Sequence, residues 1–202
     1  MSTIGPDERT SHIANPQDSF VGDPEWLLLA YKVPSEPSSN RIAIWRELKR
    51  LGAYYPQQAV CILPGRSEIR ERIGKIRERI ADMGGTDTYL EIPFVPDDQH
   101  AELVEIFTEL AAREYAEIVE ECESKFVKEI EFERFRENYT FEEAEEIRQD
   151  LDKITRWFDD VVRRDWFASS ARSEAETWVK ECGVLLESFE ADVFDRTQGS
   201  DD

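Results

Sequence analysis

The sequence lacks any long hydrophobic run, and this absence excludes a large class of proteins. No stretch of about 18 consecutive apolar residues occurs in the chain, so the sequence predicts no membrane-spanning helix. Residues 1–23 contain no apolar segment of the kind found in secretory signals. We therefore expect a cytoplasmic protein with a polar, disordered lead-in at 1–23 and a disordered tail at 196–202.

Cysteine and histidine are scarce, which argues against disulfides and metal sites. Cys61, Cys122 and Cys182 are far apart and odd in number, so we expect no disulfide framework and a reducing compartment. Each lies on an apolar stripe and is expected to be a small buried side chain. His12 and His100 stand outside any C-x-x-C or Glu-x-x-His pattern, so the sequence predicts no metal site and no cofactor.

The short motifs of common enzymes are also missing. No serine or cysteine stands in a nucleophile elbow, and no glycine-rich loop could cradle a phosphate. The many glutamates of the C-terminal half are expected to form a solvated acidic face. We therefore predict no catalytic residues and no enzymatic activity.

The chain does contain a basic segment within a strongly acidic sequence. The formal net charge is −20, yet residues 26–80 carry eleven basic and five acidic side chains, an excess of six positive charges. A local excess of this kind is typical of a surface that binds a polyanion or an oxyanion. The acidic surplus elsewhere, with more arginine than lysine, favours a surface adapted to a salty cytoplasm.

The basic excess could also arise without any bound anion, in two ways. Glu68, Glu71 and Glu78 stand three or four residues from bases of the same segment, which predicts ion pairs on one helix face. The basic face is also suited to docking on an acidic surface of this chain or of a second molecule. A basic face left open in the folded chain would favour nucleic acid, and a covered one would favour assembly.

The hydrophobic pattern of residues 24–95 predicts a ferredoxin-like module with the order β-α-β-β-α-β. The expected elements are a strand at 26–33, a helix at 40–51, strands at 53–55 and 59–63 around a turn at 56–58, a helix at 69–80 and a strand at 87–92. Gly52 is expected to end the first helix. Isoleucines at steps of four, three and four mark the second helix.

Residues 96–195 have a different pattern, which predicts three amphipathic helices packed as a bundle. The first helix is marked by apolar residues from Leu103 to Ile130. Thr140 with Glu143 forms a capping box that opens the second helix, and Ser173 with Glu176 is a candidate for the third. The predicted fold class is therefore α+β, a ferredoxin-like module followed by a three-helix bundle.

The segment Arg163-Arg164-Asp165-Trp166-Phe167 is an unusual cluster at the end of the second bundle helix. Arginines at this position complement the negative end of the helix dipole. The cluster is consistent with an internal ion pair, and it is also consistent with an oxyanion pocket.

A pattern of residues along the whole chain points to a known family. It includes Trp26, Pro34 with its serine-rich loop, Arg41 and Trp45-Arg46, in the runs WLLLAYKVPSEPSSNRIAIWRELKRLGAYY and VCILP. It continues in Arg113-Glu114-Tyr115-Ala116-Glu117, Thr140-Phe141, Arg156-Trp157 and Arg164-Asp165-Trp166-Phe167. With these residues, the stretch 24–195 resembles the N-terminal region of the ChrB family of chromate-resistance proteins.

The resemblance implies a function. Members of this family are associated with chromate export, and ChrB acts as a chromate-responsive, DNA-binding regulator. Full-length members carry a further C-terminal domain, so a homodimer or a separate partner domain is a candidate partner besides DNA and chromate or another oxyanion.

On this interpretation we predict two sets of site residues. The residues expected to contact DNA phosphates are Arg41, Arg46, Lys49, Arg50, Arg66, Arg70, Arg72, Lys75, Arg77 and Arg79. Chromate is a tetrahedral dianion, so its site needs converging arginine or backbone N–H donors. Arg41, Arg46 and Arg164 are the candidates for this oxyanion site.

Two alternative functions stay open at this point. The first is a protein-interaction or assembly module whose basic face docks on an acidic partner. The second is a metal-dependent RNase, because the module also resembles the CRISPR adaptation nucleases in fold. Those nucleases carry an aspartate after the aromatic residue that ends the first strand, whereas Lys32 follows Tyr31 here. A lysine cannot hold a divalent cation, which disfavours the nuclease.

Overall fold

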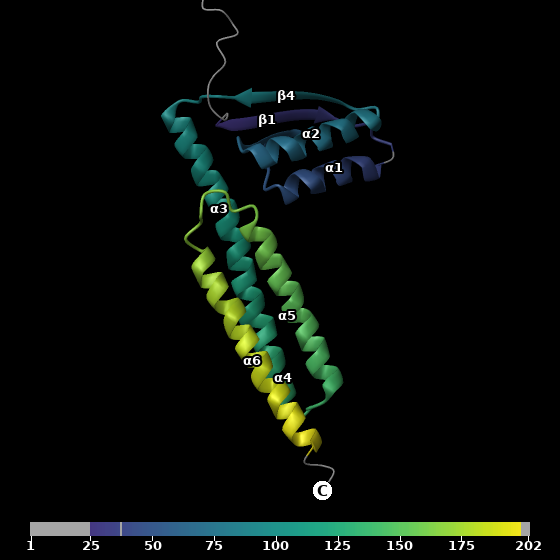
Figure 1. Ribbon diagram of the computed structural model, residues 1–202, viewed down its shortest axis with the longest axis vertical. Helices are drawn as coiled ribbons and strands as arrows, with labels where there is room; N and C mark the ends of the chain where they lie inside the picture. The colour runs from purple at the N-terminus through teal and green to yellow at the C-terminus, as the bar shows by residue number, and fades with distance from the viewer. Residues whose placement is uncertain (1–24, 37, 199–202) are drawn as a thin grey trace, which may run out of the picture.

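Two layers make up the first part of the chain, an antiparallel sheet and a pair of helices on one of its faces (Figure 1). This computed structural model describes residues 25–36 and 38–198, so the expected lead-in at 1–23 lies outside the described residues. The module, residues 25–92, contains β1 (Trp26–Lys32), α1 (Ser38–Arg50), β2 (Tyr54–Gln57), β3 (Val60–Pro64), α2 (Ser67–Asp82) and β4 (Thr86–Ile92). The order of elements is the predicted one, and the α+β class is confirmed.

The strands of the module lie in the order β2-β3-β1-β4. Leu29, near the centre of β1, lies opposite Cys61 of β3 and Tyr89 of β4. Side chains alternate between the faces of a strand, so Leu27 and Leu29 both point to the face that α1 and α2 cover, and both are fully buried.

Each of these helices buries one stripe against the sheet. The four isoleucines of α2 from Ile69 to Ile80 are all buried, as their spacing predicts. α1 buries Ile44 and Leu48 in the same core. The outward sides of both helices are consequently left to the charged residues of the basic segment.

The turn between β2 and β3 differs from the prediction. The pattern places a turn at 56–58, but β2 continues through Pro56 to Gln57, and the turn consists of Gln58 and Ala59. Ala59 takes a left-handed backbone conformation with φ of 61°. Pro56 is tolerated because β2 is an edge strand, where a missing N–H need not interrupt the sheet.

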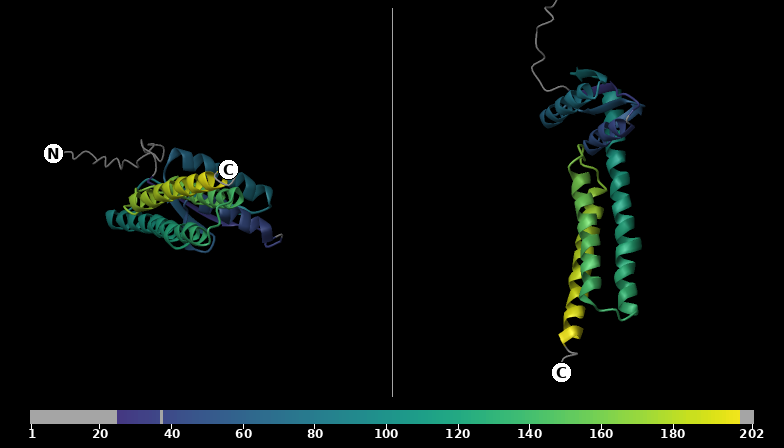
Figure 2. Two further views of the ribbon diagram at one scale, coloured as in Figure 1. Left: turned by 90° about the horizontal axis from the view of Figure 1, so that it is seen from below. Right: turned by 90° about the vertical axis from the view of Figure 1, so that its right-hand side faces the viewer.

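The bundle, residues 97–198, consists of three long helical arms packed side by side (Figure 2). The first arm is continuous and consists of α3 (Asp97–Glu121), the π-helical turn η1 (Cys122–Phe126) and α4 (Val127–Phe135). α5 (Phe141–Val162) and α6 (Arg172–Gln198) form the other two arms. Nowhere in the described ranges does a helix combine the length and apolar character needed to cross a membrane.

The ends of the bundle helices test the predicted caps. Thr140 precedes α5 and accepts a hydrogen bond from the backbone N–H of Glu143 at 3.2 Å, as its capping box predicts. The second candidate is wrong, because α6 begins at Arg172 and Ser173 already lies within the helix. α6 runs to Gln198, into the segment expected as a tail, and residues 199–202 lie outside the described residues.

Aromatic side chains join the module to the bundle at one end of the sheet. The ring centroid of Trp26 lies 5.6 Å from that of Phe107 on α3 and 5.8 Å from that of Phe167 in the α5–α6 loop. Trp166, in the same loop, donates a hydrogen bond from Nε1 to the carbonyl oxygen of Leu51 at 3.0 Å. The loop after α5 is therefore a structural contact between the two parts.

Candidate anion-binding face

The outward sides of α1 and α2 carry the basic residues that the sequence singles out. Arg41, Arg46 and Arg50 of α1 and Arg72 of α2 are exposed. Among residues 25–36 and 38–198, none of these four arginines has a hydrogen-bond or ion-pair partner. Of the described residues, those of the bundle meet α1 at its C-terminal end and leave the rest of its outward side uncovered (Figure 1).

Other predicted phosphate contacts are paired with carboxylates. The four ion pairs are Arg70–Glu91 at 3.8 Å, Lys75–Glu71 at 2.9 Å, Arg77–Asp87 at 2.6 Å and Arg79–Glu47. Lys75–Glu71 is the i,i+4 type of pair that the sequence predicts within one helix. The other three reach from α2 to α1 or β4, so acids outside the helix offset part of the basic charge.

Lys49 and Arg66 contact aromatic rings. The Lys49 ammonium lies 5.4 Å from the ring centroid of Tyr55. Arg66 donates a hydrogen bond to the carbonyl oxygen of Trp166 at 3.0 Å, and its guanidinium carbon lies 5.7 Å from the centroid of the Trp166 ring. Arg66 thus helps to hold the α5–α6 loop against the module.

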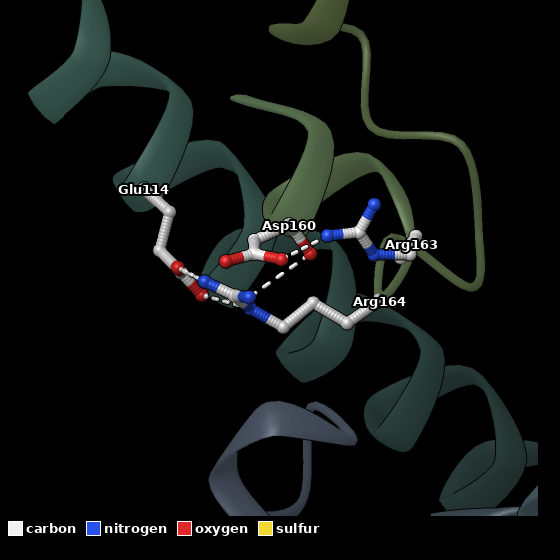
Figure 3. Close-up of polar contacts among 4 residues, drawn as sticks. All are labelled: Glu114, Asp160, Arg163 and Arg164. Atoms are coloured by element: carbon white, nitrogen blue, oxygen red, sulfur yellow. Dashed lines mark hydrogen bonds and ion pairs between the residues drawn. The ribbon is translucent and has the colours of Figure 1, made fainter. Parts of the chain in front are cut away.

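Arg164 forms an internal ion pair (Figure 3). Its guanidinium donates two hydrogen bonds to the carboxylate of Glu114 on α3, one of them at 3.1 Å, and a third to the carbonyl oxygen of Asp160 at 2.9 Å. The Arg164 side chain is 16% exposed. Such a two-bonded contact fixes α5 to α3, so the 163–167 cluster contains the internal ion pair that its sequence allows.

The three residues predicted to bind an oxyanion do not converge. Arg41 and Arg46 lie along α1, whereas Arg164 packs against Gly52 just beyond the C-terminal end of that helix. A helical rise of 1.5 Å per residue places Arg41 about 15 Å from this end. The side chain of Arg164 is engaged by Glu114 at the far end of α1 from Arg41, so these three arginines do not surround one anion.

The largest hollow described on the module lies between α1, the end of β1 and the β2–β3 turn. It has a volume of about 1340 Å³. Its walls include Tyr31, Trp45 and Tyr55, and Arg41 stands at its side. The hydroxyl groups of Tyr31 and Tyr55 lie 3.2 Å apart, and burial raises the pKa of both phenols, so both are neutral at physiological pH.

The described residues contain neither a metal-binding cluster nor an exposed thiol. They contain no group of three or more histidine, cysteine or carboxylate side chains that could hold a metal ion. Cys61, Cys122 and Cys182 are free and buried, as predicted. Burial raises the pKa of the Cys61 thiol to about 12, which keeps it protonated and unreactive.

Sequence reasoning missed the partners of the 163–167 cluster. Asp165 accepts hydrogen bonds from the Tyr115 hydroxyl at 3.2 Å and from the backbone N–H of Ser169 at 3.0 Å. Glu114 and Tyr115 both come from α3, fifty residues earlier. They lie within the REYAE run, but nothing in that run identifies its contact with α5 before the fold is known.

Comparison with known proteins bears on the resemblance seen in the sequence. A family model described as "Protein ChrB, N-terminal" matches residues 41–200. The chain belongs to the ChrB N-terminal family. The matched range includes every predicted phosphate-contacting residue and Arg164, although β1 precedes it.

One curated member of the ChrB family shows how far this chain has diverged from a relative in sequence. Protein ChrB of Cupriavidus metallidurans is 26% identical over 162 residues, which cover 80% of this chain and 46% of that relative. The chain therefore spans less than half the length of this ChrB protein. No solved structure matches the chain.

Proposed function

We propose that this ChrB-family chain is a regulatory protein associated with chromate resistance, which binds DNA through its module and has no catalytic activity. Membership of the ChrB N-terminal family supports the link to chromate resistance. The observation that carries DNA binding is that Arg41, Arg46, Arg50 and Arg72 are exposed and unpaired within the described residues.

Unpaired arginines on helix surfaces suit a phosphate backbone. A guanidinium keeps its charge at any physiological pH, and its planar fork matches the oxygens of a phosphate. Arg46 and Arg50 are one turn apart on α1, a rise of about 6 Å. Contacts of this kind supply affinity and salt sensitivity but no sequence preference.

The charge of the bundle supports contact through the module alone. Residues 97–198 carry 30 acidic and 13 basic side chains. A surface with this excess of carboxylates repels phosphates at low ionic strength. DNA is therefore expected to approach α1 and α2 from their outward sides and to stay clear of the bundle.

Fluorescence anisotropy with a labelled duplex from the region upstream of the gene tests the proposal. We expect saturable binding that weakens steeply with salt and that is released when chromate is added. Replacing Arg41, Arg46, Arg50 and Arg72 together by glutamine should lower the slope of log K against log salt by up to about four, roughly one for each phosphate that an arginine neutralises.

The matched control changes the same amount of charge on the bundle. It replaces four exposed bases, Arg113, Lys128, Arg156 and Lys180, by glutamine. Equal weakening of DNA binding in the two variants would mean that net charge alone matters and would contradict a specific face. Binding that chromate leaves unchanged would leave DNA as a partner but remove the chromate-responsive regulator.

The division of charge also favours one alternative function, assembly with an acidic partner. The open basic face of one molecule and the acidic bundle of another are complementary, so a second copy is a candidate partner. Sedimentation velocity over a salt series distinguishes this alternative. A dimer that dissociates with salt and does not form in the four-arginine variant, together with absence of DNA binding, would replace the DNA proposal.

A further inference from the structure

The hollow beside α1 is large enough to hold a small molecule. Its volume of about 1340 Å³ is ample for a drug-sized molecule, for which natural sites measure about 300–1,000 Å³. Three elements build it, with Tyr31 from β1, Ile42 and Trp45 from α1, and Tyr55 from β2. The sheet and helix that hold these four side chains are packed by the core of the module, while the loop after β1 adds Val33, Pro34, Ser35 and Glu36 to the lining.

Three aromatic side chains, those of Tyr31, Trp45 and Tyr55, line the hollow. Trp45 and Ile42 line it, and each is 46% exposed. Tyr31 and Tyr55 line it as well, and their neutral phenols add no formal charge. Apolar surface of this extent next to neutral rings gains stability when a flat apolar group displaces water from it.

Positive charge stands at the side of this aromatic surface. Arg41 and Lys32 both line the hollow, and neither has an ion-pair partner within the described residues. Glu36 is the single acidic side chain among the lining residues described. Gln57 and Gln58 add amide donors on the β2–β3 side. The lining therefore offers stacking surface and hydrogen-bond donors with an excess of positive charge.

We propose that this hollow binds a small, flat aromatic anion, with its ring packed on Trp45 and its anionic group paired with Arg41. A guanidinium beside an aromatic wall recognises both halves of such a molecule, since the ring is desolvated while the charge is paired. Lys32 and the two glutamine amides lie close enough to the same hollow to assist with the anionic group.

A small inorganic oxyanion fits this hollow poorly. A tetrahedral dianion such as chromate gains nothing from contact with three rings and needs several converging donors. The rings of Tyr31, Trp45 and Tyr55 would then have no apolar group to pack against. The inferred ligand is thus distinct from the oxyanion considered for the chain, and its binding does not depend on whether the protein binds DNA.

Isothermal titration calorimetry of the full chain with three probes tests the inference. The probes are 2-naphthoate, which has a ring and a carboxylate, 2-naphthamide, which has the ring without charge, and sulfate, which has charge without a ring. We expect saturable one-to-one binding of 2-naphthoate and at least about tenfold weaker binding of the other two.

Two pairs of variants locate the site. Arg41→Gln should weaken 2-naphthoate binding by about tenfold, whereas Arg46→Gln, on the same helix but not lining the hollow, should leave it unchanged. Trp45→Leu should weaken it at least severalfold, whereas Phe94→Leu, at another exposed aromatic residue, should not. All four positions are exposed, so the variants should fold, and thermal melts verify this.

Each outcome decides the question. Equal affinity for 2-naphthamide would overturn the anionic half of the inference, and equal affinity for sulfate would overturn the aromatic half. No saturable binding of 2-naphthoate at millimolar concentrations would overturn the site altogether. An effect of Arg46→Gln as large as that of Arg41→Gln would show attraction to the basic face and would likewise contradict a defined site.

Discussion

A side-chain carbon added at Gly52 would disturb the contact between the module and the loop after α5. Its φ of +75° lies in the left-handed region that favours glycine. A Cβ at this position would lie 3.0 Å from Cβ of Arg164 and 3.1 Å from Nε1 of Trp166. We expect Gly52→Ala to lower the free energy of unfolding by about 1–3 kcal/mol, measured by urea denaturation.

Gly74→Ala is the control for this substitution. Gly74 lies in the middle of α2, and a Cβ there would meet no atom within 4 Å. Alanine is the better helix former, so this change should raise the free energy of unfolding by about 0.5–1 kcal/mol. A neutral effect of Gly52→Ala, beside the expected gain at Gly74, would show that the loop after α5 adapts.

Single residues also show where sequence reasoning succeeds and where it stops. Gly52 is predictable as the end of α1, because that role depends only on the preceding helix. The close approach of Arg164 to Gly52 is not predictable, because it depends on how a loop more than a hundred residues later in the chain packs. The charge of Arg164 alone suggests an oxyanion site, whereas its pairing with Glu114 becomes visible only in the fold.

At the scale of elements, the Glu114–Arg164 pair joins α3 to the end of α5. The two side chains are 33% and 16% exposed. A double-mutant cycle with Glu114→Gln and Arg164→Gln should give a coupling energy of about 1–2 kcal/mol, since partial burial strengthens the interaction. Chemical denaturation of the four proteins measures it.

The neighbouring Asp160–Arg163 pair is a built-in control (Figure 3). Its side chains are 56% and 66% exposed, so the same cycle should give at most about 0.5 kcal/mol. A coupling energy at Glu114–Arg164 no larger than that at Asp160–Arg163 would mean that the pair orients the loop without stabilising the bundle.

Hydrophobic spacing predicts most helices and strands of the module. In the first arm of the bundle, the spacing of the buried residues also requires a departure from regular α-helix. Residues Ile118, Cys122, Phe126 and Ile130 are all buried, at successive steps of four. A regular α-helix cannot keep such a series on one face, because 3.6 residues make a turn. The wider π-helical turn from Cys122 to Phe126 corrects the drift. The spacing is visible in the sequence, but the kind of helical turn that accommodates it is not.

At the scale of the whole molecule, the division of charge predicts a dependence of stability on salt. The bundle carries the acidic excess, and burial together with nearby carboxylates raises the pKa of Glu129 and of Glu143. Added salt shortens the screening length from about 10 Å at 0.1 M to about 3 Å at 1 M. We therefore expect Tm to rise as sodium chloride is increased to molar concentration.

Choline chloride serves as a control for this experiment, because screening does not depend on a particular cation. The rise in Tm should be similar with both salts. A Tm that stays constant across the series would contradict the salt-adapted surface predicted from composition. A rise with sodium alone would point to cation binding by particular carboxylates.

The continuous first arm of the bundle has a mechanical consequence. From Asp97 to Phe135 it runs without a break, about 58 Å at 1.5 Å per residue, and Phe107 packs near its start against Trp26 of the module. Phe107 divides this arm into a short part toward the sheet and a part of about 42 Å beyond it. A change of about 5° in the direction of the arm at the Trp26, Phe107 and Phe167 rings would move its far tip by roughly 4 Å. The same change would move an atom 4 Å from the rings by only about a tenth of that distance.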